Sequence, residues 1–69
     1  MVPVDFKKIE RLRIRAAMTQ AEAGAKIGMS RQEWSNLVRG RYPRMAVETL
    51  ERIASALGVS AAELLKPRE

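Results

Sequence analysis

The sequence predicts a compact all-α domain of five short helices, and three observations support this fold class. The signature Ser/Thr-x-x-Glu, in which a hydroxyl caps a helix start and the glutamate reaches back to the cap, occurs three times. Apolar residues recur at spacings of three and four, as on helices with one buried face. Glycines follow three of these segments, where a left-handed residue ends a helix. We expect one domain, residues 1–69, with helices at about 5–17, 20–27, 31–39, 46–57 and 61–66.

The first expected helix begins after Asp5, a natural N-cap. Pro3 disfavours helix in the residues around it, so the helix should not start earlier. Its apolar stripe consists of Phe6, Ile9, Leu12 and Ala16. Most of its cations fall outside that stripe, namely Lys7, Lys8, Arg11 and Arg15.

The second and third expected helices form the most informative part of the chain. Their capping signatures start at Thr19 and Ser30, eleven residues apart, and Gly28 lies between them. The turn is therefore only Gly28 to Ser30. Two short helices joined by a short turn containing glycine form a helix-turn-helix, which lays its second helix into the major groove of DNA.

The third helix has one apolar edge and one polar face. Its apolar edge is Trp34, Leu37 and Val38, and its polar face is Arg31, Gln32, Ser35, Asn36 and Arg39. Gly24, inside the second helix, costs about 1 kcal/mol against alanine and therefore indicates close approach by another element. We expect the Trp34 indole to pack over Ala23 and Gly24. An exposed tryptophan that stacks on bases is the alternative, which helical periodicity disfavours.

The last third of the chain predicts two more helices. The first repeats apolar residues at helical spacing and ends at Gly58, and its stripe is Val47, Leu50, Ile53, Ala54 and Leu57. Ser60-x-x-Glu63 is the third capping signature and should open a final helix that buries Leu64.

Composition excludes several kinds of site. The chain has no cysteine and no histidine, so disulfides, thiol chemistry and the usual zinc sites are excluded. No catalytic constellation can be assembled, and we expect no enzymatic activity, no metal and no cofactor. No apolar run approaches the roughly 18 residues of a membrane span, and no signal peptide is evident. We expect a cytoplasmic protein without a small-molecule ligand.

The net charge of +5 is unevenly distributed. Residues 1–45 hold ten Lys/Arg against four Asp/Glu, a net charge of +6, whereas residues 46–69 hold three against four. Such asymmetry is typical of proteins that bind a polyanion. A solvated cationic face that only aids solubility explains the charge about equally well.

With these motifs in order, the chain resembles the phage-repressor type of helix-turn-helix domain, the Cro/CI or XRE-like family of bacterial and phage transcription regulators. The matching residues are Thr19, Gln20, Ala23, Ile27 to Ser30, Leu37, Gly40, Thr49, Leu50, Ile53, Ala54, Ala56 to Val59, Leu64 and Leu65. The resemblance implies a lambda-repressor-like fold and a transcription regulator, of repressor or controller type, that binds specific double-stranded DNA sequences.

The resemblance also implies which residues contact DNA. The base-reading residues would be Arg31, Gln32, Ser35 and Asn36. The phosphate contacts would be Gln20, Ser30, Arg39, Arg41, Tyr42 and Arg44. Arginine can donate two hydrogen bonds to guanine, and glutamine or asparagine can pair with adenine. A solvated basic loop is an equally good explanation for Arg39, Arg41, Tyr42 and Arg44.

Such domains normally bind as homodimers on near-palindromic operators, with half-sites about 34–36 Å apart. The resemblance places the dimer contact at Val59, Ala61 and Leu65, for which closure of the core is the alternative role. RNA polymerase or another protein could be a further partner. The alternative function is an antitoxin-like interaction module that binds a partner protein and autoregulates its operon.

Overall fold

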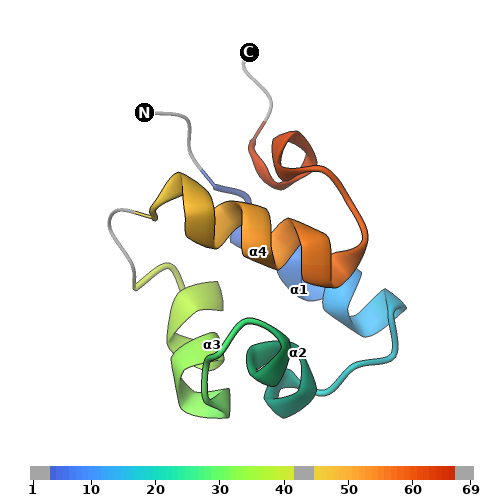
Figure 1. Ribbon diagram of the computed structural model, residues 1–69, viewed down its shortest axis with the longest axis vertical. Helices are drawn as coiled ribbons and strands as arrows, with labels where there is room; N and C mark the ends of the chain where they lie inside the picture. The colour runs from blue at the N-terminus through green and yellow to red at the C-terminus, as the bar shows by residue number, and fades with distance from the viewer. Residues whose placement is uncertain (1–3, 42–44, 67–69) are drawn as a thin grey trace.

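The computed structural model describes residues 4–41 and 45–66. Its elements are α1 (Phe6–Arg15), α2 (Gln20–Lys26), α3 (Arg31–Val38), α4 (Val47–Leu57) and a 3-10 turn, η1 (Ala61–Leu64). In Figure 1, α2 and α3 lie together in the lower half of the view, α4 crosses in front of α1, and η1 lies above α4. Each helix within these described ranges is too short or too polar to span a bilayer.

The prediction of a fifth helix over residues 61–66 is wrong, because the structure has a single 3-10 turn there, Ala61–Leu64. The capping box predicted at Ser60 is also absent, because the Ser60 side chain makes no cap hydrogen bond. The backbone N–H of Glu63 instead donates to the backbone carbonyl of Ser60 at 3.1 Å. The chain becomes extended at Leu65, which forms an antiparallel bridge with Val4, so no room remains for further helical turns.

Helix α1 begins after the predicted N-cap and ends earlier than expected. The Asp5 carboxylate accepts from the Lys8 N–H at 3.1 Å, which confirms the cap. The helix stops at Arg15 because Ala17 has a φ of +58°, in the left-handed region. The N–H of Met18 then donates to the Arg13 carbonyl at 3.2 Å, the reverse turn that commonly follows a helix end.

The buried core is apolar and draws on every element. Its members are Ile9, Ala23, Ile27, Trp34, Leu37, Leu50, Ile53, Ala54 and Leu64. Four further residues of the predicted stripes are half-buried and pack against it, namely Phe6, Leu12, Val38 and Leu57, whereas two are exposed. Val47 is 70% exposed, because it is the first residue of α4 and lies at the edge of the buried stripe. Ala16 is exposed because α1 has already ended.

Close packing of α2 against the turn explains Gly24, but not in the way predicted. A Cβ at Gly24 would lie 2.7 Å from the carbonyl oxygen of Met29 and 3.1 Å from that of Ser30. The close neighbour is therefore the backbone of the turn, and the prediction that the Trp34 indole requires this glycine is wrong. Trp34 and Ala23 are both fully buried in the shared core, which agrees with the expected inward tryptophan.

Candidate nucleic-acid interface

Both helices of the helix-turn-helix start with complete capping boxes, as predicted. The Thr19 hydroxyl accepts from the Glu22 N–H at 3.1 Å, and the Glu22 carboxylate accepts from the Thr19 N–H at 2.9 Å. Ser30 and Glu33 repeat this pair of bonds at 3.1 and 2.9 Å. The hydrogen bond from the Thr19 backbone lowers the pKa of Glu22. Side chains next to each helix start thus fix where α2 and α3 begin.

The turn between these helices is held by backbone hydrogen bonds. Gly28 has a φ of +74°, and its N–H donates to the Ala25 carbonyl at 3.3 Å. The N–H of Met29 donates to the Gly24 carbonyl at 2.8 Å. This pair of bonds around a left-handed glycine ends α2 and sets the direction in which the chain enters α3.

Helix α3 is anchored on one side and exposed on the other. Trp34 and Leu37 are fully buried. Among the predicted base-reading residues, Arg31 and Gln32 are exposed, and Ser35 and Asn36 are half-buried. The Gln32 amide donates to the Asn36 side-chain oxygen at 3.3 Å, one helical turn along. The structure therefore brings these four residues onto one accessible polar side of α3.

Among the predicted phosphate residues, Gln20 is the first residue of α2 and Ser30 is the N-cap of α3. The Ser30 hydroxyl accepts from Glu33, so its own hydrogen can still point to a phosphate oxygen. Arg39 is the C-cap of α3, and both Arg39 and Arg41 are exposed. Tyr42 and Arg44, also predicted to contact phosphate, lie outside the described residues.

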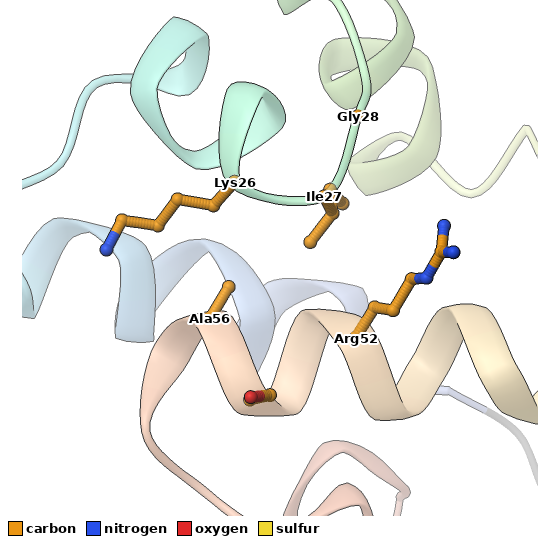
Figure 2. Close-up of a pocket in the computed structure, with 6 residues that line it drawn as sticks. Lys26, Ile27, Gly28, Arg52 and Ala56 are labelled. Carbon is orange, nitrogen blue, oxygen red and sulfur yellow. The ribbon is translucent and has the colours of Figure 1, made fainter.

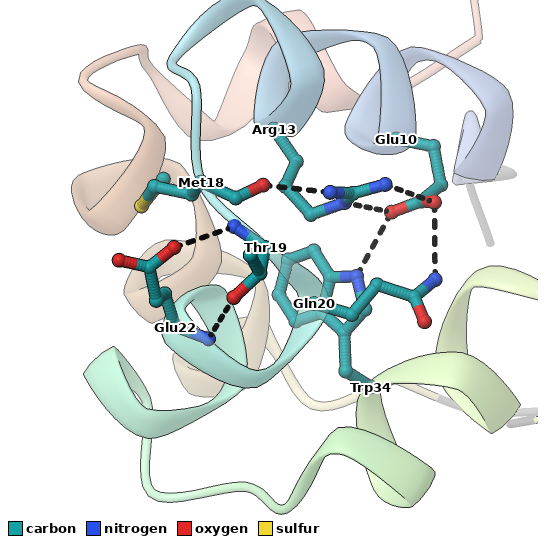
Figure 3. A network of polar contacts seen from close by, with 7 residues as sticks. All are labelled: Glu10, Arg13, Met18, Thr19, Gln20, Glu22 and Trp34. Atoms are coloured by element: carbon teal, nitrogen blue, oxygen red, sulfur yellow. Dashed lines mark hydrogen bonds and ion pairs between the residues drawn. The ribbon is translucent and has the colours of Figure 1, made fainter.

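A polar network that the sequence analysis missed connects three helices (Figure 3). The Glu10 carboxylate of α1 accepts from Arg13 Nε at 2.7 Å and from a second Arg13 nitrogen at 3.0 Å. It also accepts from the Trp34 indole N–H of α3 at 2.9 Å and from the Gln20 amide of α2 at 3.2 Å. These bonds, led by those from Arg13, lower the pKa of Glu10 against the opposing effect of partial burial.

This network holds the inner side of α3 and the start of α2 against α1. Arg13 also donates to the Met18 carbonyl at 2.6 Å, which ties the α1–α2 connection to the same carboxylate. One amide hydrogen of Gln20 is donated to Glu10, so the other is available to donate to a phosphate oxygen. A signal was available in the sequence, because a buried indole N–H needs an acceptor and Glu10 is the only carboxylate in α1.

An open groove of about 660 Å³ runs between the end of α2 and helix α4 (Figure 2). It is lined by Lys26, Ile27, Gly28, Arg52, Ser55 and Ala56. The charged ends of Lys26 and Arg52 point toward opposite ends of this groove, so they do not converge on one ligand. In residues 4–41 and 45–66, no group of three or more His, Cys, Asp or Glu side chains could hold a metal ion.

The predicted dimer residues lie in and beside η1. Val59, Ala61 and Leu65 are each half-buried and pack against the core. Leu65 also forms the bridge with Val4. Their placement serves core closure and leaves part of each side chain exposed, so the dimer contact stays a prediction.

Solved structures share this fold. The hydroxypropylphosphonic acid epoxidase from S. wedmorenis matches with a TM-score of 0.87 at 22% identity, over 99% of this chain and 36% of the epoxidase. This chain thus spans about a third of that enzyme's length. The master regulator for biofilm formation SinR, in complex with DNA, matches with a TM-score of 0.76 at 22% identity, over 86% of this chain and 94% of SinR. At these identities, both likenesses show the fold alone.

Sequence relatives are more specific. The chain is 46% identical over 59 residues to an uncharacterized HTH-type transcriptional regulator, y4dJ, from Sinorhizobium fredii, covering 86% of this chain and 75% of that protein. A family model described as helix-turn-helix domain matches residues 8–66. The predicted helix-turn-helix resemblance is therefore confirmed, and the chain belongs to the helix-turn-helix domain family.

Proposed function

We propose that this protein is a transcription regulator that binds specific double-stranded DNA sequences as a homodimer. The observation that carries the proposal is the two-sided α3, which has Trp34 and Leu37 buried and Arg31, Gln32 and Asn36 on its accessible side. The regulator name of the y4dJ relative and the DNA complex of SinR support it. The likeness to the epoxidase concerns only this helical portion, so catalysis is not part of the proposal.

Readout of bases would come from the accessible side of α3. Arg31 can donate two hydrogen bonds to the O6 and N7 of guanine. Gln32 or Asn36 can pair with both edge groups of adenine, and Ser35 can bond to several bases. The hydrogen bond that the Gln32 amide donates to the Asn36 side-chain oxygen restrains both side chains on the helix surface, which lowers the conformational entropy lost on binding.

Contacts to the DNA backbone would position α3 in the groove. Phosphate oxygens would be bound by the second amide hydrogen of Gln20, the hydroxyl of Ser30 and the guanidinium groups of Arg39 and Arg41. We extend the same role to Tyr42 and Arg44. Such contacts fix the register on the duplex and make affinity depend on salt, but they carry no direct sequence information.

Two copies on a near-palindromic operator would supply the remaining affinity, because one small helix-turn-helix covers limited DNA surface. Residues 46–69 carry a net charge of −1, so two such segments can meet without strong repulsion. We place the dimer contact at the exposed portions of Val59, Ala61 and Leu65. Repression by blocking RNA polymerase and activation by contacting it are both compatible with this arrangement.

A matched pair of arginine variants tests the proposal. Arg31→Ala should cost about 1–3 kcal/mol on the best operator and relax preference at one base pair, because it removes a bidentate base contact. Arg41→Ala should weaken binding to all sequences alike and lower the salt slope by about 1. Fluorescence titrations with operator and unrelated duplexes, at two salt concentrations, measure both effects. Equal losses on every duplex for both variants would contradict base readout by Arg31.

A further inference from the structure

Helix α1 carries a row of cations on its outer side that the DNA-binding proposal does not use. Lys8, Arg11 and Arg15 line a shallow groove of about 310 Å³ together with the half-buried Leu12. We call these four residues the α1 stripe. Lys7 and Ile14 border it, both exposed, Ile14 by 63% of its surface.

The α1 stripe points away from the helix-turn-helix formed by α2 and α3. At about 100° per residue, the centre of its three cations lies roughly 130° around α1 from both Ile9 and Glu10. Ile9 faces the core, and Glu10 faces α2 and α3 through its bonds to Gln20 and Trp34. Trp34 in turn points from α3 toward α1, so the polar side of α3 faces away from α1. A duplex seated on α3 therefore lies on the side of the molecule opposite the stripe.

These charges lower the stability of the helix that carries them. Lys8 and Arg11, and Arg11 and Arg15, are like-charged neighbours at spacings of three and four, which repel each other. Lys7 and Lys8 lie in the first turn, where the helix dipole disfavours cations and where α1 has no acidic residue. The one ion pair formed within residues 4–41 and 45–66 is between Arg13 and Glu10, outside the stripe. The stability of the folded chain therefore does not explain why these cations are present.

We propose that the α1 stripe docks an acidic surface of a partner protein, in the form of a helix rich in glutamate or aspartate with apolar residues beside the carboxylates. The positive charge of the α1 stripe favours an anionic partner surface. Its three cations extend about 10 Å along α1, a length that matches about two turns of a partner helix. The half-buried Leu12, which lines the groove beside the cations, adds apolar surface that a phosphate backbone does not require and that a protein partner would bury. This docking is independent of the DNA contact, so DNA and the partner can be bound together.

The test uses a synthetic helical peptide with glutamates on one side and leucines beside them, added to the ¹⁵N-labelled chain of residues 1–69. One variant combines Lys8→Gln, Arg11→Gln and Arg15→Gln. The matched control combines Lys26→Gln, Arg52→Gln and Lys66→Gln, which removes the same charge from other exposed positions. Peptide binding should shift the amide signals of α1 and weaken about tenfold in the stripe variant but only about twofold in the control. Duplex affinity should fall by the same factor in both.

Several outcomes would overturn the proposal. Equal losses of peptide binding in the two variants would mean that only net charge matters. Shifts on α3 instead of α1 would show that the peptide occupies the DNA-binding side, and a larger loss of duplex affinity in the stripe variant would assign the stripe to phosphates. No binding by the peptide, or equal binding after its glutamates are replaced by glutamine, would also contradict the proposal. These peptide controls hold even if the stripe variant folds poorly.

Discussion

The α2–α3 unit and the α4–η1 segment are stabilised in different ways. In the first, the side chains of Thr19 and Ser30 accept hydrogen bonds from backbone N–H groups and fix both helix starts. In the second, the starts at Ala46 and Ser60 lack side-chain caps. The α4–η1 segment is held instead by its buried apolar residues, Leu50, Ile53, Ala54 and Leu64. Local chemistry therefore sets the geometry of the helix-turn-helix pair, and tertiary packing holds the segment that supports it.

Truncation of a core side chain should give the largest loss of stability. On α4, this loss should be confined to the buried side of the helix. Ile53→Ala should lower the free energy of unfolding by about 2–5 kcal/mol, because Ile53 is fully buried and leaves a cavity. Val47→Ala, at a 70% exposed position on the same helix, should change it by less than about 0.5 kcal/mol. Urea unfolding measures both. Comparable losses at the two positions would contradict the packing of α4.

Removal of the Glu10 charge should give the second-largest loss of stability. Glu10→Gln should cost about 1.5–3 kcal/mol at neutral pH, because bonds to Arg13 and the Trp34 indole lose their ionised acceptor. The folded-state pKa of Glu10 is lowered, so its contribution is complete above the unfolded value of about 4.3 and is lost as pH falls through the folded value. The stability gap between wild type and variant should therefore close in acid. A gap that stays constant from neutral pH down to about pH 3 would be inconsistent with this network.

Gly24→Ala sharpens the comparison within the α2–α3 unit. Alanine normally stabilises a helix interior by about 1 kcal/mol relative to glycine. Here the added Cβ would lie 2.7 Å from the Met29 carbonyl oxygen, so the turn must shift. A net loss of about 1–2 kcal/mol is expected in thermal unfolding, opposite in sign to the usual effect. If the variant were stabilised, the turn would not be packed against α2.

The smallest expected losses of stability come from replacing the serines that precede α3 and η1, Ser30 and Ser60. Ser30→Ala should cost about 1 kcal/mol, because the Glu33 N–H loses its cap. Ser60→Ala should cost only a few tenths, since the Ser60 side chain makes no cap hydrogen bond. Chemical unfolding of both variants measures the difference. Equal costs would erase the distinction between the locally capped unit and the packed segment.

The sequence could predict those features whose signals are local. Thr19 and Ser30 with their glutamates, and Gly28 between them, specify two helix starts and a turn within a short stretch. Ser60 carries the same signature as Ser30, yet it forms no capping box: the Glu63 N–H donates to the Ser60 backbone carbonyl in a 3-10 turn, and Leu65 just beyond it pairs with the distant Val4. A local signal fails where a long-range contact opposes it.

The candidate site was predictable to a similar extent. Helical periodicity separates the buried Trp34 from the accessible Gln32, as the structure also does. The bond between Glu10 and Trp34 spans 24 residues, so helical spacing does not reveal it, and only the need of a buried indole N–H for an acceptor indicates it. The reason for Gly24 also escaped prediction, because it depends on where the backbone of Met29 lies after folding.

Selection of bound sequences from a random pool of DNA duplexes, at two salt concentrations, tests most directly whether the polar side of α3 reads bases. The account predicts an enriched motif with two related halves about 34–36 Å apart, relaxed at one base pair in each half for Arg31→Ala. A folded wild-type protein that enriched no motif at either salt concentration would contradict it.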